Sequence, residues 1–154
     1  MPALVANSTF IEIAPAKTTG LNDLGVPLVE GTLVKKGKLG EFSQVLDDGK
    51  IGRMYQNLRA IAVKTEEGGE PSARLFLLFE VFGDNNAPLA PNVGFALRVL
   101  AGADTLLELR QPTLFLPYAC AWYDNRCVFD LPLDAFERTD RIEFLTLDEA
   151  VRAI

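Results

Sequence analysis

Residues 74–82 read R-L-F-L-L-F-E-V-F, and this stretch decides the fold of the chain. Successive side chains of a β-strand point to opposite faces. From Leu75 to Phe82 every odd-numbered residue is apolar, and Glu80 is the only polar residue among the even-numbered ones. A strand that is apolar on both faces is covered on both faces. The stretch therefore predicts the central strand of a packed β-structure.

Short apolar or alternating segments, separated by turn residues, continue on both sides of this stretch. Residues 37–52 are rich in turn residues, with Asp47-Asp48-Gly49 as the clearest turn signal and only a weak strand at 42–46. Strands are expected at 8–14, 28–35, 58–65, 93–101, 105–110, 113–116, 118–123, 126–131 and 141–147.

Strands of this length and spacing are typical of a sandwich or barrel, and no long segment has helical periodicity. The prediction is an all-β fold: one antiparallel β-sandwich domain over residues 1–154, with Greek-key or jelly-roll connections. An α+β fold with one large antiparallel sheet is the alternative. Residues 132–138 could form a helical turn. Thr146 and Glu149 have the spacing of a capping box, which predicts a short C-terminal helix from Leu147 to the chain end.

The composition is that of an ordinary globular domain, since 49% of the 154 residues are hydrophobic and 23% are charged. The longest apolar run, Leu75–Phe79, is far shorter than the roughly 20 residues of a membrane-spanning helix, so membrane insertion is not expected. Residues 1–7 lack the basic start and apolar stretch of a signal peptide. We expect either a cytosolic protein or a mature exported domain.

Charge and residue usage exclude several classes of function. The net charge of −6 argues against a nucleic-acid partner, whose binding surface would be basic. The chain has no histidine, which removes the commonest general base and the commonest metal ligand. Two cysteines are too few for a four-thiolate zinc site. No metal or cofactor is expected.

An aromatic cluster near residue 122 is the candidate recognition surface. Asp124 and Asn125 tolerate the positive φ angles of a tight hairpin turn, so a hairpin is expected there. Trp122 and Tyr123 could form a ligand platform, with Asp124, Asn125 and Arg126 adding polar groups. Ordinary packing of these aromatic side chains is the favoured interpretation, and the ligand platform is the alternative.

Cys120 and Cys127 flank this predicted hairpin. With a two-residue loop their side chains would not be directly opposed, so a disulfide would need a bulge or a longer loop. Two buried free thiols are the favoured interpretation. A disulfide is the alternative, and it would imply an oxidising compartment.

Two further clusters are predicted to be polar loops. Asp84, Asn85 and Asn86 could offer oxygen ligands to calcium, but they lack the regular spacing of a calcium loop. The basic cluster at residues 35–38 (Lys35, Lys36 and Lys38) adjoins two glycines. A solvated loop explains this cluster better than a phosphate site does.

These observations favour a non-catalytic binding or assembly module that acts through loops or strand edges. A protein partner or self-association is expected. The alternative is an enzyme that uses carboxylates alone, acting on a carbohydrate, which would require two acids on one concave surface.

Overall fold

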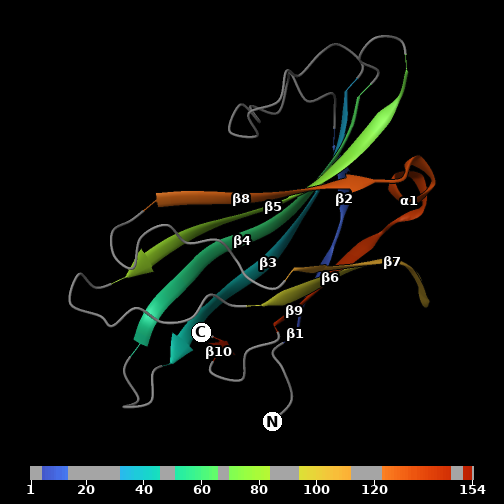
Figure 1. The fold of residues 1–154 in the computed structure, drawn as a ribbon. Coiled ribbons are helices and arrows are strands. Elements are labelled where there is room, and N and C mark those ends of the chain that lie inside the picture. Colours follow the sequence, from blue (N-terminus) through green and yellow to red (C-terminus); the bar gives the residue numbers. More distant parts are fainter. Residues whose placement is uncertain are drawn as a thin grey trace.

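A computed structural model describes the chain over residues 5–13, 32–45, 51–65, 70–83, 94–111, 123–146 and 151–153. These residues form two antiparallel sheets that pack against each other, together with one short helix (Figure 1). The prediction of an all-β sandwich is confirmed.

The smaller sheet has four strands in the order β1-β9-β6-β7. Strands β6 and β7 form a hairpin, and β9 inserts between β6 and the N-terminal strand β1. The strands are β1 (Val5–Thr9), β6 (Phe95–Ala101), β7 (Asp104–Gln111) and β9 (Arg141–Thr146).

The larger sheet has six strands in the order β10-β3-β4-β5-β8, with β2 also pairing with β3. Strands β3, β4 and β5 form a meander, and β8 returns beside β5 after the β6–β7 hairpin of the other sheet. The chain therefore leaves the larger sheet after β5 and comes back to it with β8. The strands are β2 (Ile11–Ile13), β3 (Leu33–Val45), β4 (Ile51–Thr65), β5 (Ser72–Gly83), β8 (Tyr123–Leu131) and β10 (Val151–Ala153).

Strand β5 is the predicted central strand, and it is buried on both faces. Leu75, Leu77 and Phe79 belong to the core between the sheets. Phe76 and Leu78 lie on the opposite face of the same strand and are also buried. The double burial explains why the stretch carries almost no polar residue.

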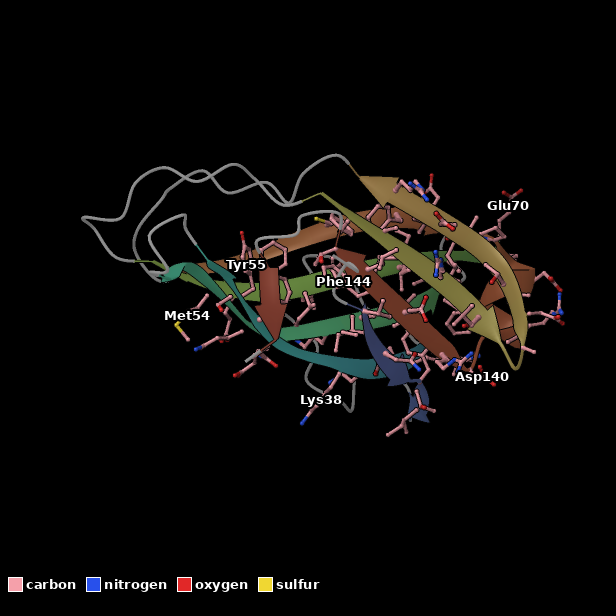
Figure 2. All side chains as sticks on the ribbon, turned by 90° about the horizontal axis from the view of Figure 1, so that it is seen from below. Lys38, Met54, Tyr55, Glu70, Asp140 and Phe144 are labelled. Atoms are coloured by element: carbon pink, nitrogen blue, oxygen red, sulfur yellow. The ribbon has the colours of Figure 1, made fainter. Side chains whose placement is uncertain are left out.

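Stacked aromatic rings join the two sheets at the centre of the core. Phe42 stacks on Tyr55 with ring centroids 4.6 Å apart, and on Phe144 of the other sheet at 5.5 Å. Phe144 in turn stacks on Phe95 at 5.5 Å. Figure 2 shows Tyr55 and Phe144 between the two layers. Each such pair contributes about 0.5–1.5 kcal/mol beyond its buried area.

The short helix α1 (Leu133–Arg138) forms where a helical turn was predicted. The other helix prediction, to the chain end, is wrong in its last part, because Val151–Ala153 forms strand β10 on the edge of β3. A helix of a few residues is marginal by itself, whereas edge pairing supplies backbone partners. No helix in the described ranges is long and apolar enough to cross a membrane.

Strand β3 is longer than its sequence predicts. It continues to Val45 through a glycine-rich region that predicts turns and only a weak strand at 42–46. Here Gly40, with φ of +94°, lies between two register shifts of the β3–β4 ladder. The glycine therefore permits a β-bulge within a strand instead of ending it.

Candidate functional site

Of the predicted recognition surface, Trp122–Arg126, the last four residues lie within strand β8. The register pairs Asp124 and Asn125 with the central strand β5, so the predicted hairpin turn is wrong. β8 pairs with β5 along its whole length of nine residues, and this ladder outweighs the local turn preference of Asp and Asn. Trp122 lies outside the described residues, and only the backbone of Tyr123–Arg126 is described. The aromatic platform therefore stays a prediction.

The thiol of Cys127 is half-buried on β8. Burial raises the pKa of this thiol above its ordinary value. Because the thiolate is the nucleophile, the raised pKa lowers its reactivity near neutral pH. Cys120 lies outside the described residues, so the relation between the two cysteines stays a prediction.

The polar loop at residues 84–86 also lies outside the described part of the chain. Within the described ranges, no group of three or more His, Cys, Asp or Glu side chains is placed to hold a metal ion. Two lysines of β3, by contrast, line a groove.

The basic cluster Lys35, Lys36 and Lys38 lies on strand β3, not in the solvated loop that was predicted. Lys35 is paired with the core residue Ala62, and its side chain is buried. Because side chains alternate, Lys36 and Lys38 lie on the outer face of the sheet. Lys38 extends away from the aromatic core (Figure 2). The cluster thus consists of one interior lysine and two surface lysines.

Lys35 connects β3 to the C-terminal end of helix α1. Its Nζ donates to the carbonyl oxygens of Phe136 (2.5 Å), Thr139 (3.1 Å) and Glu137 (3.4 Å). The same ammonium lies 4.9 Å from the centroid of the Phe136 ring. Carbonyls at a helix C-terminus lack intrahelical donors and carry the negative end of the helix dipole. The role of Lys35 is therefore structural.

The two surface lysines line a groove of about 530 Å³ together with Arg59 of β4. The register places Arg59 opposite Lys38 and the apolar Ile61 opposite Lys36. Ile11 of β2 lies across from Lys36 on the other side, and 66% of its surface is exposed. The groove therefore combines three positive charges with apolar side chains.

The groove forms where the N-terminal segment passes from one sheet to the other. β1 pairs with β9 and β2 pairs with β3, with the single residue Phe10 between them. The Phe10 amide donates to the Asp140 carbonyl (2.7 Å) at this bend. Gly37 lets β1 approach β3, because a Cβ at this position would collide with the Ser8 hydroxyl. The close approach places Asn7–Thr9 along one wall of the groove.

Charges on the outer face of the other sheet are paired. Arg98 donates to Glu143 (2.8 Å) and Glu108 (3.4 Å), and Arg110 donates to Glu108 (2.6 Å). The hydrogen bond from Arg110, aided by Arg98, lowers the pKa of Glu108 below its ordinary value. The two groove lysines, by contrast, form no ion pair with any residue that the structure describes.

A second hollow of about 350 Å³ adjoins the groove and shares Lys38 with it. Glu41 of β3 and Glu80 of β5 supply two carboxylates to this acidic hollow. It lies at the bulges, where Gly40 and Asn57 have φ angles of +94° and +52°. Glycine and asparagine tolerate such left-handed values best. Bulges re-aim side chains and are frequent beside functional sites.

The sequence contained one indication of the groove, but the prediction of a solvated loop gave it no meaning. Lys36 and Lys38 are two positions apart, as residues that share one face of a strand must be. Arg59 and Ile11 could not be added to them, because their place in the groove depends on which strands pair and in which register.

Comparison of the chain with models of protein families, with curated proteins and with solved structures finds no match. The chemistry of the groove follows from its own residues. Ammonium and guanidinium groups hold carboxylate, sulfonate or phosphate groups, and apolar walls favour ligands that also have an apolar part.

Proposed function

We propose that this chain is a non-catalytic binding module that holds an anionic ligand in the groove at the edge of β3. The convergence of Lys36, Lys38 and Arg59 on one groove carries the proposal. The whole chain has a net charge of −6. A local positive site on such a chain attracts an anion to one place instead of to the surface as a whole.

The apolar residues of the groove add to the proposed affinity. Ile11 is 66% exposed, and covering its side chain with a ligand would contribute roughly 1–2 kcal/mol. Arg59 adds a guanidinium charge to the two lysine charges of the groove. Its guanidinium also donates to the Asn57 carbonyl (2.9 Å), which orients it.

The probe for this proposal is anilinonaphthalene sulfonate, which has an aromatic body and one anionic group. Its fluorescence is followed in titrations of the wild type and of Lys36→Gln/Lys38→Gln. Losing two partly solvated charges should weaken binding by about tenfold. The matched control is Arg74→Gln/Arg138→Gln, which removes the same charge from exposed positions outside the groove. Equal affinities of the two double variants would refute the proposal.

The alternative function, a carboxylate-dependent enzyme that acts on a carbohydrate, stays a prediction. One observation favours it: Glu41 and Glu80 line the same acidic hollow. Loss of a glycosidase activity in Glu41→Gln and in Glu80→Gln would support this alternative. Self-association and the absence of a nucleic-acid partner likewise stay predictions.

A further inference from the structure

The groove and the acidic hollow share Lys38 and carry opposite charges, and the two together are called the track. Lys36 and Arg59 belong to the groove, Glu41 and Glu80 belong to the hollow, and Lys38 lines both. Lys36 and Glu41 are five positions apart, which corresponds to about 16 Å along a strand. A small anion would occupy one end of this track, whereas an extended ligand would reach both.

The edge of β3 beside this track has no strand paired to it in the described structure. β2 pairs with residues 34–36 and β10 pairs with residues 42–44. Between them, at residues 37–41, no described strand continues the ladder, although β1 lies close by. Extended peptides bind to such edges through main-chain hydrogen bonds, while side chains on alternate positions give specificity.

We infer that the groove binds an extended peptide segment of a protein partner, with an acidic residue four positions from a basic residue. The acidic side chain lies against Lys36, Lys38 and Arg59, and the basic side chain lies against the carboxylates of the hollow. Residues four positions apart in an extended segment share a face and are about 13 Å apart, which lies between the separations of Lys38 and of Lys36 from Glu41 (about 10 and 16 Å). This inference rests on the proposed function, because it names the ligand class of the same groove.

Two fluorescein-labelled peptides with blocked ends, E-V-T-V-K and E-V-T-V-E, test the inference by fluorescence anisotropy. They differ only in the charge at the end that would meet Glu41 and Glu80. The wild type should bind E-V-T-V-K about tenfold more tightly, because the second peptide places like charges together. The variant Glu41→Lys/Glu80→Lys should reverse this preference.

The matched control is Glu70→Lys/Asp104→Lys, which makes the same change in net charge at two exposed positions. Glu70 lies far from Lys38 (Figure 2). This control should keep the preference of the wild type for E-V-T-V-K. If it reversed the preference as well, net charge and not the hollow would be responsible, and the inference would be overturned.

Two further outcomes separate this inference from the proposed function. In the first, both peptides bind the wild type equally, and both lose binding in Lys36→Gln/Lys38→Gln. This result would refute the inference that the ligand carries charges of both signs, and it would support the proposed anion-binding groove. If neither peptide binds the wild type, the inference fails, and the sulfonate titration decides the proposed function separately.

Discussion

Replacing Lys35 by methionine tests the connection between β3 and helix α1. Methionine keeps a long, unbranched side chain but removes the ammonium. The three carbonyl oxygens at the end of the helix, those of Phe136, Glu137 and Thr139, then lose their common donor. The cation–π contact with the Phe136 ring is lost as well.

The magnitude follows from the burial of these groups. The bonds to Phe136 and Thr139 are buried, and the bond to Glu137 is partly buried. Removing one partner from a buried charged interaction costs about 3–5 kcal/mol. The wild type must desolvate the Lys35 ammonium when it folds, and the methionine variant does not. This difference offsets part of the loss. We expect Lys35→Met to lower the free energy of unfolding by about 3 kcal/mol, or the melting temperature by about 10 °C.

Urea unfolding followed by the fluorescence of Trp122, the only tryptophan, measures this change. The matched control is Lys36→Met, the same substitution one position along the strand on the outer face. It should change the free energy of unfolding by less than about 0.5 kcal/mol. The reasoning would be refuted if Lys35→Met were as stable as the wild type, or if both variants lost the same amount.

Substitutions at Gly37 and Glu137 and alkylation of Cys127 test three further features of the fold. Gly37→Ala should destabilise the fold by about 2 kcal/mol in urea unfolding, because its Cβ meets the Ser8 hydroxyl. Adding Ser8→Gly should restore part of that loss, and no recovery would contradict the steric explanation. The hydrogen bond from Lys64 lowers the pKa of Glu137 below its ordinary value. The folded state thus gains stability above about pH 4.3, which is lost as the pH falls through the lowered value. Thermal melts across this acid range should show a smaller decline for Glu137→Gln, and identical pH profiles would count against the contact. Because burial raises the pKa of Cys127, its alkylation by iodoacetamide at about pH 8 should be slower in the native protein than in urea. A Cys120→Ser variant isolates this thiol, and equal rates in the two states would show that burial does not protect it.

The candidate site shows where prediction from sequence stops. The glycines and aspartates of residues 37–52 predict turns, with only a weak strand at 42–46. Pairing with β4 nevertheless carries β3 through this region as far as Val45. Asp124 and Asn125 were likewise expected in a turn, and pairing with the central strand keeps them extended. In both cases a long ladder to a buried neighbour outweighs local preference.

By itself, the sequence determined the class of fold and its central strand. The alternation of burial is local, because the face on which a residue lies depends only on its position along its own strand. Leu75–Phe79 could therefore be recognised as a buried strand without knowing which strands pair with it. Only the tertiary structure decided that Lys35 supports a helix while Lys36 and Lys38 face a groove with Arg59 and Ile11. Those neighbours come from other strands, and their register depends on the packing of the whole chain instead of on any local pattern.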